Sequence, residues 1–197
     1  MADESDNRND DYERLKLLYQ VSKVLHSTLE PQEALQLIVR ETVKLTNASS
    51  GSIALLNPTT GCLEIEAAHG LPDEAFNMRL LQNEGITGWV SRTGKPARVA
   101  KVYDDSRYVK IAPGVCSELA VPLLVGGELR GVLNMDSERE NAFSEADQDL
   151  LVELAEQAAR VIHNTWLYEQ LRQKARLSDG LLSIGQAVNS TLNLDDT

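Results

Sequence analysis

Residues 117–136 read SELAVPLLVGGELRGVLNMD, and this stretch decides the fold class. Two apolar runs, Ser117–Val125 and Leu129–Asp136, are separated by Gly126-Gly127-Glu128. The two glycines supply the positive backbone angles that a tight turn requires. The stretch therefore predicts an antiparallel β-hairpin.

A second hairpin is predicted upstream of the first. Gly51–Asn57 is a short apolar run, and residues 57–61 (NPTTG) have the composition of a turn. In Cys62–Gly70, apolar and acidic residues alternate with the period of a strand that has one wet face. Between the hairpins we predict short helices over Leu71–Leu81 and Gly88–Thr93, a strand over Ala97–Lys101 and a polar loop over Val102–Gly114.

Helices are predicted on both sides of the strands. Apolar residues recur at helical spacing in Tyr12–Leu25 and again in Pro31–Asn47. Downstream, Ser144 is the expected N-cap of another helix and Asp147 its capping-box partner. No Pro or Gly interrupts Ser144–Asp179, so this helix is longer than one domain of this size needs.

The long helix carries a pattern typical of coiled coils. Its second half is expected to pack on a second subunit or to lead into another domain. The residues predicted to form one seam along it are Leu151, Leu154, Ala158, Val161, Thr165 and Tyr168.

The end of the chain repeats its beginning. Leu181–Leu192 matches Leu18–Leu29 at four of twelve positions. We therefore predict four parts: a disordered acidic tail (1–10), one folded domain (11–165), a linker helix (166–180) and the truncated start of a second copy of the domain (181–197).

Composition excludes several classes of partner. The 197 residues carry 19 Lys and Arg against 30 Asp and Glu, a net charge of -11 that repels phosphate backbones and anionic lipid. No apolar run approaches the roughly 18 residues needed to cross a bilayer, and the first residues contain no apolar signal segment. We expect a cytoplasmic protein with neither nucleic-acid nor membrane partners.

Six short motifs follow one another along the chain: GSIALL (51–56), AAHGLP (67–72), GITGWV (85–90), VYDDSRY (102–108), SELAVPL (117–123) and GVLNMDS (131–137). In this order they resemble the GAF domain, the small-molecule sensing module of bacterial signalling proteins and cyclic-nucleotide phosphodiesterases. The resemblance covers about Leu17–Val161.

The resemblance implies an α+β fold (an α/β sandwich) of the GAF/PAS type. Its central antiparallel sheet would have five to six strands with helices packed on one face. The first and last helices of such domains pack together and frequently dimerise, which implies a homodimer through the N-terminal and C-terminal helices. The other face would hold a ligand cavity, roofed by the loops before and after the third strand.

The loop over 102–114 supplies three candidate ligand contacts, Asp104, Asp105 and Arg107, because a loop over a pocket can aim carboxylates and a guanidinium inward. The alternative, which the residue types favour, is that these side chains cap and staple the loop itself. Trp89 and Tyr108 are candidates for stacking on a planar ligand, although large aromatic side chains commonly serve as packing.

Two further candidates, Cys116 and Asn134, complete the predicted site. The family's cyclic-nucleotide binders share a signature of Asn, Lys, Phe, Asp and Glu, for which this chain offers Asn134, Phe143 and Asp147, has Gln148 at the Glu position and lacks the Lys. A cyclic nucleotide therefore stays open as a ligand. Those same residues are equally explained as a hairpin end, a helix staple and a cap.

Covalent bilin and haem are not expected. Relatives that attach a bilin usually have His after the Cys, whereas Ser117 follows Cys116 here. His26, His69 and His163 are scattered and form no spaced metal site.

Catalysis is not expected either. GAF relatives that reduce free methionine sulfoxide use several cysteines in the pocket loops, and this chain has only Cys62 and Cys116. No nucleophile triad or phosphate-binding loop is recognisable. The sequence favours a non-catalytic regulatory domain that binds a small molecule and signals through its terminal helices. The alternatives are a ligand-free dimerisation module and, less favoured, a free methionine sulfoxide reductase.

Overall fold

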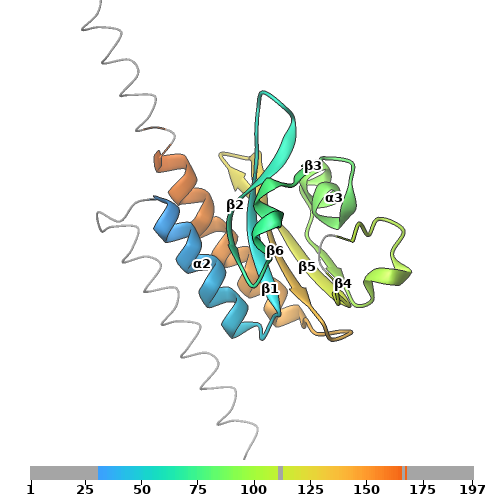
Figure 1. Ribbon diagram of the computed structural model, residues 1–197. Coiled ribbons are helices and arrows are strands. Elements are labelled where there is room, and N and C mark those ends of the chain that lie inside the picture. The colour runs from blue at the N-terminus through green and yellow to red at the C-terminus, as the bar shows by residue number, and fades with distance from the viewer. Residues whose placement is uncertain (1–30, 111–112, 166, 168–197) are drawn as a thin grey trace, which may run out of the picture. The chain divides into compact units, whose positions relative to one another are not determined.

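An antiparallel sheet of six strands, in the order β3-β2-β1-β6-β5-β4, forms the centre of the molecule (Figure 1). The computed structural model describes residues 31–110, 113–165 and 167. The strands are β1 (Ser50–Leu56), β2 (Cys62–His69), β3 (Arg79–Leu81), β4 (Ala97–Val99), β5 (Ser117–Val125) and β6 (Glu128–Ser137). This confirms the predicted α+β fold with five to six strands.

Both predicted hairpins are present, and β1 pairs with β6 to join them into one sheet. The β5–β6 turn uses Gly126 and Gly127, whose φ angles are +60° and +84°. A β-bulge between Leu123 and Leu124 shifts the pairing of these two strands by one residue. The bulge decides which residues of β5 and β6 face each other farther along the ladder.

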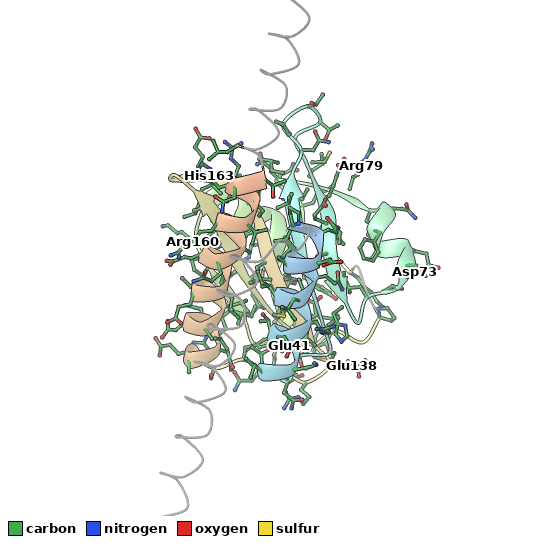
Figure 2. The ribbon with its side chains drawn as sticks, turned by 90° about the vertical axis from the view of Figure 1, so that its left-hand side faces the viewer. Glu41, Asp73, Arg79, Glu138, Arg160 and His163 are labelled. Carbon is green, nitrogen blue, oxygen red and sulfur yellow. The ribbon has the colours of Figure 1, made fainter. Side chains whose placement is uncertain are left out.

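One face of the sheet is covered by α2 (Pro31–Leu45) and by the C-terminal helix, which the structure describes over residues 145–165. The two helices lie side by side in Figures 1 and 2. A Cβ atom at Gly51 of β1 would lie 2.5 Å from the Met135 sulfur and 2.9 Å from Val43 Cγ2 of α2. The absence of a side chain at Gly51 therefore lets α2 approach the sheet closely.

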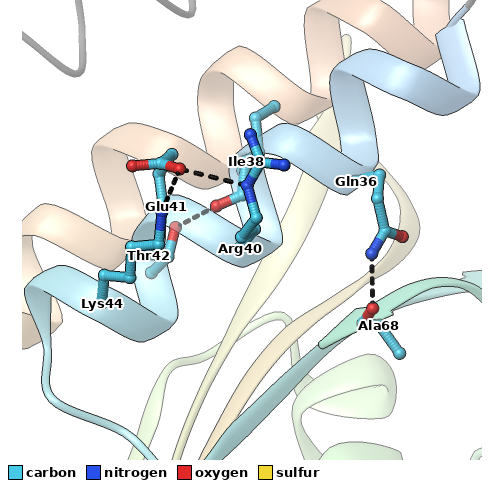
Figure 3. A network of polar contacts seen from close by, with 7 residues as sticks. All are labelled: Gln36, Ile38, Arg40, Glu41, Thr42, Lys44 and Ala68. Carbon is cyan, nitrogen blue, oxygen red and sulfur yellow. Dashed lines mark hydrogen bonds and ion pairs between the residues drawn. The ribbon is translucent and has the colours of Figure 1, made fainter. Parts of the chain in front are cut away.

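Polar contacts fix the position and ends of α2 (Figure 3). Gln36 Nε2 donates to the carbonyl oxygen of Ala68 on β2 at 2.6 Å, which ties the helix to the strand. On the exposed side, Glu41 Oε1 accepts from Lys44 Nζ at 2.8 Å and from Arg40 Nε at 3.2 Å. The position of α2 agrees with the predicted helix over Pro31–Asn47.

The cap of the C-terminal helix is the predicted one. The Ser144 backbone N–H donates to Asp147 Oδ2 at 2.7 Å, and the Asp147 N–H donates to Ser144 Oγ at 3.2 Å. The residues predicted as the start of a coiled-coil seam are instead buried within the domain. These are Leu151, Leu154, Ala158 and Val161.

The opposite side of the sheet carries α3 (Gly85–Thr93) and two short 3-10 helices, η1 (Asp73–Asn77) and η2 (Val102–Asp104) (Figure 1). The predicted helix over Leu71–Leu81 is wrong at its end, where Arg79–Leu81 forms strand β3. Pairing with Cys62–Glu64 of β2 supplies backbone hydrogen bonds that a local pattern does not reveal.

Several predicted segments lie outside the described residues: the acidic tail (1–10), the helix over Tyr12–Leu25, most of the linker (166–180) and the second copy (181–197). The chain divides into two compact units, Met1–Val161 and Ile162–Thr197, and the sheet, α2 and the C-terminal helix as far as Val161 belong to the first. Among the described residues, no helix combines the length and apolarity needed to span a membrane.

Candidate ligand site beneath α3

Side chains of β6 alternate between two environments. Leu133 and Met135 point to the α2 side, whereas Val132, Asn134 and Asp136 point to the α3 side. Asn134 and Asp136 therefore lie on the α3 face of β6, whereas the residues that alternate with them pack on the α2 face.

An apolar cluster holds α3 on the sheet. Ile86 and Val90 of α3 are buried against Ala54 and Val132 of the sheet. A Cβ atom at Gly88 would lie 2.6 Å from the Leu81 carbonyl oxygen, so α3 also sits directly on β3. The partly buried side chains at the edge of this cluster are Leu56, Ile65, Trp89 and Tyr108.

Two acidic side chains lie beneath α3 at one end of this cluster. Glu118 of β5 pairs in register with Asp136 of β6, and cross-strand partners share one face of a sheet. Thr87 Oγ1 of α3 donates to Glu118 Oε1 at 3.2 Å, and Asn134 Nδ2 donates to Asp136 Oδ1 at 3.1 Å. The Ser50 hydroxyl on β1 also donates to the Asp136 carboxyl.

Burial shifts both carboxyls toward their protonated forms. Glu118 is only 6% exposed, and its desolvation, reinforced by the negative charge of Asp136, raises its pKa well above the ordinary value. Desolvation also raises the pKa of Asp136 to about 6, against smaller opposing effects of the Asn134 and Ser50 hydrogen bonds. Both carboxyls therefore bind their protons more tightly than carboxyls in water do.

The predicted loop residues Asp105 and Arg107 bind each other. Arg107 Nε donates to Asp105 Oδ1 at 2.8 Å and Arg107 Nη2 to Asp105 Oδ2 at 2.6 Å. The guanidinium also lies 4.5 Å from the centre of the Trp89 ring, a cation–π distance. The side-chain hydrogen bonds that Asp105 accepts from Arg107 lower the pKa of the Asp105 carboxyl. The stapling interpretation of this ion pair thus agrees with the observed contacts.

The remaining predicted residues separate into two groups. Tyr108 packs at the edge of the apolar cluster, and Asn134 is buried at the base of the site. Asp104 is exposed on the loop, and half-buried Cys116 contacts the exposed Tyr103 hydroxyl. The hydrogen bond to Cys116 raises the pKa of Tyr103 to about 12. The structure therefore does not bring Asp104 into the site.

Sequence reasoning missed Glu118, Asp136 and Thr87 as candidate site residues. The sequence did mark Glu118, because this acidic residue stands in a predicted strand between small Ser117 and apolar Leu119. The pairing with Asp136 had no such signal, because it depends on the β-bulge at Arg130 of β6, a position that the β5–β6 register skips. Among the described residues, no group of three His, Cys, Asp or Glu is placed to hold a metal ion.

Comparison with known proteins places this architecture in a family. The family model described as "GAF domain" matches residues 28–163. The chain is 31% identical over 130 residues to the Nif-specific regulatory protein of Azospirillum lipoferum, covering 62% of this chain and 21% of that protein. It therefore spans about a fifth of that curated relative.

Solved structures with the same fold include the GAF domain of a phosphotransferase and a reductase. The GAF domain of a phosphoenolpyruvate-protein phosphotransferase from Coxiella burnetii aligns with a TM-score of 0.73 and 24% identity, over 81% of this chain and 98% of that one. The free methionine-R-sulfoxide reductase of Neisseria meningitidis aligns with a TM-score of 0.69 and 21% identity, over 76% and 88% of the two chains. With the family model matching well over half of the sequence, this chain belongs to the GAF domain family.

Proposed function

We propose that this GAF domain is a regulatory module that binds a small molecule beneath α3 and relays its occupancy to the helices on the other face of the sheet. The observation that carries the proposal is the polar cluster of Glu118, Asp136 and Asn134. Buried ionisable groups with displaced pKa values destabilise a fold and gather at functional sites. A purely structural sheet face would be served better by apolar side chains.

The relay runs through the strands that both faces share. Asn134 and Asp136 face the site, while Leu133 and Met135 between and beside them pack toward α2. A ligand that moves β6 therefore changes the surface on which α2 rests. Coupling of this kind requires a difference in ligand affinity between two helix arrangements worth about 1 to 3 kcal/mol.

A homodimer through the terminal helices is part of this proposal. Exposed side chains of α2, among them Gln32, Gln36 and Arg40, line a hollow beside this helix. Since Leu151 and Leu154 of the C-terminal helix are buried within their own domain, a second subunit would contact other faces of that helix.

Cyclic nucleotides are disfavoured as the ligand. The phosphate would approach two acidic groups, and Arg107, whose charge acts on Glu118, is already bound by Asp105. The residues shared with the cyclic-nucleotide signature also have structural roles. Asn134 bonds Asp136, and Asp147 caps the C-terminal helix.

The proposed function is tested by a thermal-shift screen of metabolites on the full chain. A ligand present at 100 times its dissociation constant should add about 2.7 kcal/mol to stability. Spin labels at Arg40 and Arg160, both exposed on the two covering helices, should then report a changed distance distribution on binding. A ligand that binds without moving these labels would remove the relay, and failure of the whole screen would favour the ligand-free dimerisation module.

A second candidate, a free methionine sulfoxide reductase, is favoured by one observation. Cys116 lies two residues before Glu118 at the edge of the site, and reductases of this kind share the fold. Reduction of a sulfoxide by two thiols yields a thioether, a disulfide and water, so a second thiol must reach Cys116.

Cys62 is not that second thiol within one chain. It begins β2, whereas Cys116 precedes β5, and three strand spacings of about 4.8 Å separate β2 from β5. The register also puts the two residues at opposite ends of the sheet. A disulfide requires Cα atoms within about 7 Å. We expect no turnover of free methionine sulfoxide with thioredoxin or dithiothreitol, and turnover that Cys116→Ser abolishes would establish the enzyme.

A further inference from the structure

The acidic pair beneath α3 has no cationic partner in the described part of the chain. None of the ion pairs there involves Glu118 or Asp136. The Arg107 guanidinium, whose charge acts weakly on Glu118, is held by both carboxylate oxygens of Asp105. Buried Glu118 and half-buried Asp136 therefore face each other with hydroxyl and amide donors alone.

A third hydrogen-bond acceptor beside this pair lacks a partner. Asn134 is 7% exposed, and its Oδ1 atom is buried without a hydrogen bond from any described residue. Its Nδ2 atom already donates to Asp136. Burial of an unpaired carbonyl oxygen is unfavourable. The amide therefore points to a hydrogen-bond donor that the described chain does not provide.

The residues around Asn134 are small. Ala68, Ser52, Asn134, Ala120 and Ala97 pair in register across β2, β1, β6, β5 and β4. Asn134 is the longest side chain in this row, so its amide extends farther from the sheet than the side chains paired with it. A small group bound here would meet mainly acceptors.

We propose, on the basis of the function proposed above, that Glu118, Asp136 and Asn134 bind the ammonium group of an organic amine. An ammonium has three N–H donors and no acceptor, which matches three neighbouring acceptors, and its charge compensates the pair. A divalent cation fits less well, because two carboxyls and one amide supply fewer oxygen ligands than such ions take in proteins.

Binding of an ammonium is linked to the protons on the pair. A nearby positive charge favours the carboxylate forms, so the amine competes with the protons that burial retains on Asp136 and Glu118. With the pKa of Asp136 at about 6, affinity should rise about tenfold between pH 5 and pH 8.

The groups around the pair include others that could titrate. The loop contributes Asp105, Arg107 and Tyr108, while α3 and β1 contribute the hydroxyls of Thr87 and Ser50. Desolvation raises the pKa of Tyr108, and the Arg107 hydrogen bond lowers that of Asp105, so neither changes charge between pH 5 and pH 8.

The test uses n-butylammonium chloride, 1-butanol and sodium butyrate as probes of equal chain length, titrated into the full chain by calorimetry at pH 5 and pH 8. We expect butylammonium to bind, about tenfold more tightly at pH 8. Butanol and butyrate should bind at least tenfold more weakly. Asp136→Asn and Glu118→Gln should each weaken butylammonium binding at least tenfold at pH 8, whereas Glu128→Gln, at the exposed first residue of β6, should leave it unchanged.

Both site variants keep the shape of the side chain and remove a buried charge, so they are expected to fold, which circular dichroism checks. Asn134→Ser provides a further variant that leaves the pair intact. The proposal is overturned if butylammonium fails to bind at pH 8, if butanol binds equally well, if Asp136→Asn binds as the parent does, or if magnesium chloride displaces the amine. In any of these cases, a neutral or anionic metabolite found in the thermal-shift screen would still support the proposed function.

Discussion

The two faces of the sheet differ in the polarity of the side chains that β6 places on them. On the α2 side, Leu133 and Met135 of β6 are fully buried, and Gly51 leaves room for the helix to approach. On the α3 side, the alternating residues Asn134 and Asp136 are polar. Strand β6 thus contributes apolar packing on the α2 side and polar groups for the candidate ligand site on the α3 side.

The polar α3 face depends for its stability on the apolar packing of the α2 face. Burial of the acidic pair lowers stability, since desolvation disfavours the charged carboxylates. Close-packed aliphatic side chains on the α2 side offset this cost. Truncation of an aliphatic side chain on the α2 side should therefore lower stability, whereas removal of a carboxyl charge on the α3 side should raise it.

The largest effect is expected for Leu133→Ala, which leaves a cavity at a fully buried position on the packed face. We expect the free energy of unfolding to fall by about 3 kcal/mol. Urea denaturation measures it, with Leu124→Ala as the matched control, because Leu124 on β5 is 46% exposed. A loss no greater than that of the control would mean that the α2 side does not hold the sheet.

The next effect has the opposite sign. In the folded protein, burial raises the pKa of Asp136 from 3.8 to about 6. The folded state therefore binds the Asp136 proton more tightly than the unfolded state does. This contribution to the free energy of unfolding is fully present below about pH 4 and is lost as the pH rises from about 4 to 6. At pH 8, Asp136→Asn should increase the free energy of unfolding by on the order of 2 kcal/mol.

This gain should disappear at pH 4, where the carboxyl is protonated in both the folded and unfolded states. Urea denaturation at pH 4, 6 and 8 measures the trend. A variant less stable than the parent at pH 8 would show that the Asp136 carboxylate stabilises the fold.

A smaller effect is expected for Gly88→Ala on the binding face. The new methyl group would meet the Leu81 carbonyl oxygen of β3, a backbone atom that cannot rotate away. We expect a loss of about 1 to 2 kcal/mol, although alanine is the better helix former. Arg92→Ala, on the exposed side of α3, is the control and should change stability by less than about 0.5 kcal/mol. Equal stability of both variants would contradict the close approach of α3 to the Leu81 backbone at Gly88.

The smallest effect is expected for Arg107→Lys, which keeps the charge but loses the forked bond to Asp105 and the planar contact with Trp89. The cost should stay below about 1 kcal/mol, because the ion pair is partly exposed. Trp89 fluorescence, read in a Trp166→Phe background, should nevertheless change. An unchanged spectrum would argue against the Arg107–Trp89 contact in solution.

Local patterns predicted most of the fold because each element carried its own signal. Glycine pairs or turn residues marked the hairpins, and Ser144 with Asp147 marked the start of the C-terminal helix. The short strand β3 was missed, because three residues carry too little pattern and depend on pairing with β2.

The candidate site was only partly predictable. Trp89, Tyr108 and Asn134 were named from the sequence and lie on the α3 side, whereas Asp104 lies in solvent. A two-residue turn without a bulge would put Glu118 opposite Met135, on the α2 side. The shift at Leu123 and Leu124 puts it opposite Asp136 instead.

Spacing, turn chemistry and composition were enough to predict most helices and strands, the family and the net negative charge from the amino-acid sequence. Only the tertiary structure decided that Glu118 and Asp136 share one face and that Asn134 lies unpaired beside them. The physical reason is that side chains alternate along a strand, so a one-residue change in register exchanges the face on which a group lies.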